Sequence, residues 1–227
     1  HGMPFPGAKF NCYPNSVRSP WVIRWPGKIK AGAVDKTHMI STVDLQPTIL
    51  EAVGLKSPKS DGRSFGPLLR GETQDGRDAV FAQFHHIHGK DALPMRAVIT
   101  KDAAYVFNPW SDGKRSFGRL GGSAFGAMKQ MAQKDVAMAA RIKHLTLRSV
   151  EECFDLQRDP GCLKNLAGSN KHKNQFDALR SKLRAWMVEV KDPALDAFDK
   201  RDQTAALEQF VQDYRAAAQK VKAELRA

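Results

Sequence analysis

Long apolar runs and cysteine pairs are both scarce in this sequence. No stretch reaches the roughly 18 consecutive apolar residues that a membrane-spanning helix needs, so we expect no membrane span. The three cysteines, Cys12, Cys153 and Cys162, are too few for a disulfide framework and lack metal-binding spacing. Their spacing leaves a pairing of Cys153 with Cys162 open. The chain is therefore not a small domain held together by disulfides or by a zinc-cysteine site.

Several common catalytic signatures are also missing. The sequence holds no glycine loop for binding phosphates, no His-Glu-x-x-His helix for zinc, and no Gly-x-Ser-x-Gly nucleophile turn. The enzyme classes that depend on these motifs therefore have no support here, and no internal repeat is found.

Acidic residues are outnumbered by basic ones. The 227 residues include 36 Lys and Arg against 24 Asp and Glu, giving a net charge of +12 and an isoelectric point near 9.8. Half of this excess falls in residues 101–150. Such a balance favours contact with a polyanion, or reflects a lysine-rich solvated surface. With 42% hydrophobic residues, the composition is that of a folded protein of one large or two small domains.

The first half of the chain is expected to mix strands and helices. Residues 21–25 are apolar and β-prone, which predicts a buried strand. A capping-box pattern from Ser41 to Asp44 predicts a helix over 45–53, and a further turn is expected around 65–70. Further strands are predicted at 79–84, 95–100, 103–108 and 152–156.

The second half is expected to be mostly helical. Residues 113–126 hold five glycines and predict a loop, followed by an Ala- and Met-rich helix over 127–144. Apolar residues at helical spacing predict two amphipathic helices, over 174–190 and 203–226. Stripes of this kind are core or packing surfaces far more often than ligand sites.

A series of short motifs follows in a fixed order from the amino terminus. The series comprises Lys9, Tyr13, Arg18-Ser19-Pro20, Trp25-Pro26-Gly27, Asp44-Leu45-Gln46-Pro47-Thr48, Asp61-Gly62-Arg63-Ser64 and Leu69-Arg70-Gly71. In this order the set resembles the C-terminal half of the type I sulfatases, within the alkaline phosphatase superfamily. So many matching points in one order make the resemblance specific.

Later motifs narrow the resemblance to one branch. His85-His86, Pro94-Met95-Arg96, Phe154-Asp155-Leu156, Asp159-Pro160 and Asn165-Leu166-Ala167 are most similar to sulfamidases, the heparan N-sulfatases. The resemblance covers residues 1–198, and Cys162 departs from it, standing where the family usually has Glu.

The resemblance implies an α/β fold, the C-terminal part of a sulfatase. Residues 1–75 would supply edge elements of a large mixed sheet. Residues 76–198 would form a small α+β domain with a short antiparallel sheet and a packed helix. Residues 199–227 would form a basic amphipathic terminal helix, which would dock on the body or join two copies in a homo-oligomer.

The resemblance also assigns site residues. His1 matches the second residue of the pair that ligates a divalent cation, usually calcium, although imidazole suits calcium less well than oxygen does. Lys9 matches the basic residue that contacts the sulfate ester or sulfamate, where its charge would offset negative charge on the leaving atom. His85 and His86 would line the sugar pocket. Considered from the residues alone, a histidine cluster lies at the end of a predicted strand and consists of His85, His86 and His88. Such a cluster is either a site for a metal or a substrate, or a set of exposed loop residues.

The sulfatase nucleophile is not in this chain. Sulfatases use a formylglycine formed from the Cys or Ser of a Cys/Ser-x-Pro-x-Arg motif, with an Asp-Asp metal pair upstream, and neither motif occurs here. The run Cys12-Tyr13-Pro14-Asn15-Ser16 has Ser where the motif needs Arg, so Cys12 is not expected to be the nucleophile. The chain, which begins His-Gly-Met-Pro, is expected to be a piece of a longer protein and inactive without the N-terminal sulfatase half. The resemblance implies a periplasmic or secreted enzyme acting on a sulfated saccharide, with no nucleic acid partner.

Two other functions remain open at this point. One is a non-catalytic module that binds a heparin-like polyanion through Lys114, Arg115, Arg119, Lys129, Lys134, Arg141 and Lys143. The other is a phosphoesterase of the same superfamily. An upstream formylglycine motif would favour a sulfatase, whereas an upstream Thr or Ser without that motif would favour a phosphoesterase.

Overall fold

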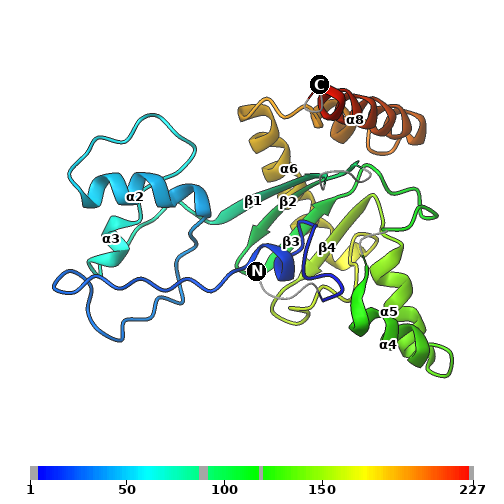
Figure 1. The fold of residues 1–227 in the computed structure, drawn as a ribbon, viewed down its shortest axis with the longest axis horizontal. Coiled ribbons are helices and arrows are strands. Elements are labelled where there is room, and N and C mark those ends of the chain that lie inside the picture. Colours follow the sequence, from blue (N-terminus) through cyan, green and yellow to red (C-terminus); the bar gives the residue numbers. More distant parts are fainter. Residues whose placement is uncertain (1–4, 87–91, 118–119, 225–227) are drawn as a thin grey trace. The chain divides into compact units, whose positions relative to one another are not determined.

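The chain divides into two compact units. The computed structural model describes residues 5–86, 92–117 and 120–224 (Figure 1). Residues 1–19 and 81–227 make up the first unit, and residues 20–80 make up the second. This division differs from the expected boundaries at 75 and 198, because the amino-terminal segment and the terminal helix both group with the sheet. No helix in the described part of the chain is long and apolar enough to cross a membrane.

The first unit is built on a four-stranded sheet. Its strands are β1 (Ala79–His86), β2 (Ala92–Thr100), β3 (Ala103–Phe107) and β4 (Glu151–Asp155), in the spatial order β1-β2-β3-β4. The pairs β2/β3 and β3/β4 are antiparallel, and Lys101 and Asp102 make the hairpin turn between β2 and β3. All four strands expected in this region are confirmed.

Strand alternation separates the two faces of the sheet. Tyr105 pairs with Cys153 and Val106 with Glu152, so successive residues of β4 point to opposite faces. Glu151 therefore points toward one face, where Tyr105 donates a 2.7 Å hydrogen bond to it. Glu152 points toward the other face, where it contacts Tyr13. Two adjacent carboxylates thus belong to two separate polar networks.

Helices cover the Glu151 face of the sheet. α6 (Lys173–Glu189) packs on β2 and β3, α7 (Leu195–Asp199) packs on α6, and α8 (Thr204–Glu224) packs on β2 and α7 (Figure 1). The buried side chains of α6 are those of Phe176, Leu179, Leu183 and Met187, the stripe that the sequence predicted. The terminal helix thus packs on its own chain, and the prediction that it joins two copies stays untested.

A buried ion pair joins the sheet to these helices. Arg96 of β2 and Asp192, which lies between α6 and α7, are 1% and 0% exposed. Arg96 donates two hydrogen bonds to the Asp192 carboxylate, Nε to Oδ2 at 2.5 Å and Nη2 to Oδ1 at 2.9 Å. Asp192 Oδ1 also accepts the backbone N–H of Ala194 at 2.8 Å. The two charges are tolerated inside the protein because each is paired and hydrogen-bonded.

The second unit is organised around Asp44. It holds a 3-10 turn (Thr42–Asp44), α2 (Leu45–Ala52) and α3 (Gly66–Leu69). The Asp44 carboxylate is 1% exposed and accepts the backbone N–H groups of Ser41 and Arg63, both at 2.8 Å, and an N–H of Arg77. A Cβ at Gly62 would lie 2.0 Å from the Val43 carbonyl oxygen, so only glycine fits there. The Asp44 and Gly62 motifs are therefore structural elements of this unit.

Two expectations from the sequence are wrong, and one question that the sequence left open is answered. Residues 21–25 form no strand, because a strand needs a paired neighbour and no described segment pairs with them; Val22 is 92% exposed. The helix expected at 127–144 is two helices, α4 (Gly122–Met131) and α5 (Val136–Thr146), and α4 begins inside the expected loop. Asp135 starts the second helix by accepting the N–H groups of Ala137 and Met138. Cys153 and Cys162 are free thiols, so the pairing left open is not formed.

Replacing Asp192 by Ala is expected to lower the free energy of unfolding by about 3–5 kcal/mol, because Arg96 would stay buried without its partner. Urea unfolding of the purified variant measures this loss. The double variant Arg96→Met, Asp192→Leu should recover most of it, since no unpaired charge remains. A loss below about 1 kcal/mol for Asp192→Ala would contradict this role of the pair.

Candidate functional site

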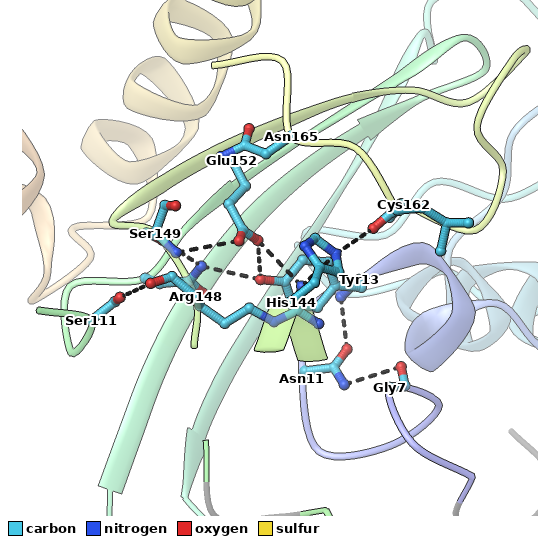
Figure 2. Close-up of polar contacts among 12 residues, drawn as sticks. Gly7, Asn11, Tyr13, Ser111, His144, Arg148, Ser149, Glu152, Cys162 and Asn165 are labelled. Carbon is cyan, nitrogen blue, oxygen red and sulfur yellow. Dashed lines mark hydrogen bonds and ion pairs between the residues drawn. The ribbon is translucent and has the colours of Figure 1, made fainter. Parts of the chain in front are cut away.

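Lys9 lies on a tight loop that the side chain of Asn11 closes. Asn11 Nδ2 donates to the carbonyl oxygens of Gly7 at 3.2 Å and Lys9 at 2.9 Å, and its Oδ1 accepts the backbone N–H of Tyr13 at 2.9 Å (Figure 2). Gly7 and Phe10 adopt left-handed backbone angles, with φ of 81° and 63°. A Cβ at Gly7 would lie 3.3 Å from Leu145, so glycine suits both the angle and the close approach.

Tyr13 anchors this loop to the sheet. Its ring is 4% exposed and meets Phe154 of β4 edge to face, with 6.0 Å between ring centroids. Its hydroxyl donates to Glu152 Oε2 and accepts from Asn108 Nδ2 at 3.1 Å (Figure 2). Burial, together with the charge of Glu152, raises the pKa of Tyr13 well above 10. The phenol therefore keeps its proton and remains the donor in this bond.

Two basic side chains of α5 and the segment after it surround the anchor. The Arg148 guanidinium stacks 4.1 Å from the centre of the Tyr13 ring and lies 3.7 Å from Glu152. His144 Nε2 lies 2.8 Å from the Cys162 carbonyl oxygen and 3.2 Å from Arg148 Nη1. Burial, and then the charge of Arg148, lower the pKa of His144. A neutral His144 that donates Nε2–H to Cys162 fits the first contact and the lowered pKa, and leaves Arg148 as a close neighbour rather than a hydrogen-bond donor to that nitrogen.

Cys12 is excluded as a nucleophile by its surroundings. Its side chain is 1% exposed, its Sγ donates to the Met95 carbonyl oxygen at 3.8 Å, and burial raises its pKa to about 12. A nucleophilic cysteine needs an accessible thiolate, which such a site does not supply. This agrees with the rejection of Cys12 on sequence grounds.

The residues expected in the site are not brought together in the described structure. Lys9 is half-buried, and its ammonium forms no ion pair or hydrogen bond with another described residue, which leaves it available to an anion. His85 stacks on Tyr214 of α8 and its Nδ1 contacts the Tyr214 hydroxyl. His86 is the last residue of β1. Their role in a sugar pocket stays a prediction, and His1 and His88 lie outside the described residues.

No metal centre is formed by the described residues themselves. Nowhere among them do three or more His, Cys, Asp or Glu side chains come close enough to hold an ion. The described part of the chain therefore supplies the cationic side chain of Lys9 and the loop, closed by Asn11 and anchored by Tyr13, that holds it. Any cation would need ligands from elsewhere.

Sequence comparisons relate the chain to known enzymes. Residues 8–107 match the family described as "N-sulphoglucosamine sulphohydrolase, C-terminal". An ulvan-active sulfatase of Formosa agariphila is 26% identical over 198 residues, covering 82% of this chain and 36% of that protein. Human N-sulphoglucosamine sulphohydrolase is 26% identical over 216 residues, covering 88% of this chain and 42% of that protein. The chain spans about a third of the length of the first curated relatives it matches.

Solved structures show the same fold. A protein in complex with its substrate D-glucosamine-2-N,6-O-disulfate aligns with a TM-score of 0.52 at 19% identity, covering 77% of this chain and 29% of that one. A sulfatase-like structure from Bacteroides thetaiotaomicron aligns with a TM-score of 0.51 at 23% identity, covering 73% and 28%. At this identity the alignments show the fold alone.

Replacing Tyr13 by Phe is expected to lower the free energy of unfolding by about 1.5–3 kcal/mol, because buried Glu152 loses its closest donor. Tyr105→Phe is the matched control, since it also removes a phenol hydroxyl that donates a hydrogen bond to a carboxylate. Its partner Glu151 is 23% exposed and keeps Arg180 and Arg201, so the loss should be smaller. Urea unfolding compares the two variants, and equal losses would contradict the special role of Tyr13.

Proposed function

Because the chain corresponds to the C-terminal part of a sulfatase, we propose that the whole protein hydrolyses sulfate esters or sulfamates of sulfated saccharides. The observation that carries this proposal is the ammonium of Lys9, unpaired among the described residues, on a loop fixed by Asn11 and Tyr13. Two relatives add support, since one is named as ulvan-active and the other as a sulphoglucosamine sulphohydrolase. The net charge of +12 suits an anionic substrate.

Lys9 contributes electrostatic stabilisation in this proposal. When sulfur is attacked, negative charge develops on the oxygen or nitrogen that leaves. An ammonium held in place beforehand stabilises that charge without having to reorganise during the reaction. The closed loop and the Tyr13 anchor limit how far Lys9 can move, so this chain supplies a positioned cation.

The nucleophile and the main cation ligands are assigned to an upstream segment. A formylglycine there would attack sulfur, and a bound calcium ion would polarise the sulfate oxygens. His1 is retained as a further candidate ligand, although imidazole is a poor calcium ligand. We expect the chain to be inactive without that segment, and the whole protein to be periplasmic or secreted.

In the protein that carries the upstream segment, Lys9→Ala should lower kcat for sulfate release by about a hundredfold or more, because a preorganised charge is lost. Lys9→Arg should keep most activity, and Lys30→Ala, which removes an exposed cation elsewhere, should have little effect. Sulfate released from D-glucosamine-2-N,6-O-disulfate is measured by ion chromatography. Unchanged turnover in Lys9→Ala, or an upstream sequence without Cys/Ser-x-Pro-x-Arg, would refute the assignment.

A further inference from the structure

A small basic cavity lies beside the loop that carries Lys9. Its volume is about 20 Å³, room for a water molecule or a single oxygen of a larger group. Its basic side chains are those of Arg141, His144 and Arg148, while Tyr13 and Asn15 also line it and the loop residues Pro6 and Gly7 form another wall. Neither Asp nor Glu lines it.

Two of the lining side chains follow from the geometry of α5. Arg141 and Leu145 are four residues apart, which places them on one side of the helix, whereas Arg148 lies in the segment after it. Leu145 is buried and would touch a Cβ at Gly7, so this side faces the amino-terminal loop. Lys143, two residues from Arg141, is exposed on another side of the helix.

The carboxylates nearest the cavity are already engaged. Glu152 accepts the Tyr13 hydroxyl and the backbone N–H of Ser149, and lies 3.7 Å from Arg148. Asp159 accepts the backbone N–H groups of Leu163 and Lys164. Arg141 makes no hydrogen bond or ion pair with another described residue. Burial, and then the charge of Arg148, lower its pKa. The charge of Asp159 acts on Arg141 in the opposite direction and to a lesser extent, without an ion pair between the two. Two neighbouring cations of this kind form an environment that an anion would stabilise.

Several other cations of this unit have a carboxylate partner. Arg184 pairs with Asp199 at 2.7 Å, and Arg180 pairs with Asp177 and Glu151. Lys200 pairs with Asp196 at 2.9 Å. Arg141 differs from these in being half-buried at the cavity without an ion pair to another described residue.

We propose that Arg141, with the charge of Arg148 beside it and the neutral His144 ring as a wall, forms a subsite for an oxyanion group, a sulfate or carboxylate carried by the saccharide unit next to the one that is cleaved. One oxygen of the group enters the cavity and the guanidinium of Arg141 pairs with the rest at its mouth. This inference rests on the proposed function, because it assigns the anion to the substrate. A subsite of this kind makes multiply charged saccharides better substrates than singly sulfated ones.

Binding of a heparin hexasaccharide to the 227-residue chain, measured by calorimetry at fixed ionic strength, tests the subsite without requiring turnover. Arg141→Gln should weaken binding about tenfold or more, since a charge-assisted contact is lost. Lys143→Gln removes the same charge from another side of the same helix and should change the affinity less than about threefold. Arg141→Lys should restore part of the binding. Equal losses for Arg141→Gln and Lys143→Gln, or no loss for either, would overturn the proposal.

Two further arms separate the sources of the anion. Sodium sulfate, titrated against sodium chloride of equal ionic strength, should compete with the hexasaccharide in the wild type and less in Arg141→Gln. If only free sulfate depends on Arg141, the substrate role is wrong. A DNA oligonucleotide of equal charge should show no Arg141 dependence, and equal dependence would reject the saccharide assignment.

Kinetics distinguish this inference from the proposed function. In the protein with its upstream segment, Arg141→Gln should raise KM for a multiply sulfated saccharide several-fold, and should raise KM for a singly sulfated one clearly less. If the Arg141→Gln variant releases sulfate without this change in KM, the subsite is wrong and the proposed function still stands. Absence of any sulfate release, with binding still dependent on Arg141, would overturn the proposed function and the substrate role while leaving an anion site.

Discussion

Glu152 is a carboxylate buried to 2% exposure, and the position of the Lys9 loop depends on how that charge is satisfied. An uncompensated buried carboxylate costs several kcal/mol, so the fold must bring donors to it. Tyr13 supplies a hydroxyl, Ser149 a backbone N–H, and Arg148 a nearby positive charge. Since Tyr13 is four residues from Lys9, satisfying Glu152 also fixes the loop against the sheet. A structural requirement of β4 thereby determines where a candidate catalytic cation lies.

The two faces of the sheet use neighbouring carboxylates for different purposes. Glu151 and Arg96 connect the sheet to the helices α6, α7 and α8 through ion pairs with Arg180, Arg201 and Asp192. Glu152 connects the sheet to the amino-terminal loop on the opposite face. The helical layer stabilises the unit (Figure 1), whereas the loop face carries Lys9 and the basic cavity. Damage to one network should therefore leave the other largely intact.

Sequence periodicity predicted much of the fold. The strands β1 to β4 and the helices α6 and α8 are confirmed within a few residues, because apolar alternation and helical stripes reflect burial directly. The strand at 21–25 was not formed, since pairing depends on a neighbour that local sequence does not reveal. The split of α4 from α5 was missed although Asp135 is a strong helix-capping residue.

The candidate site was only partly predictable. Lys9 and Tyr13 were found through ordered motifs, but nothing in the sequence linked Tyr13 to Glu152, which lies 139 residues away. Arg141 and Arg148 were seen only as part of a basic stretch, because charge alone does not reveal which cations lack partners. His85 and His86 were grouped by adjacency, and nothing in the sequence linked His85 to Tyr214 of the terminal helix, on which it stacks. The candidate site depends on contacts between residues far apart in the sequence and on the orientation of helices, and the local sequence pattern contains neither.

Backbone hydrogen exchange in Glu152→Gln tests most directly whether the carboxylate holds the Lys9 loop in place. The change keeps the size of the side chain and removes its charge, so the bond from Tyr13 weakens from a charge-assisted to a neutral one. The amides of residues 7–13 should then exchange about fivefold faster, for a loss near 1 kcal/mol, while those of β2 and β3 keep their protection. Unchanged exchange in the loop, or an equal increase throughout the chain, would contradict the account.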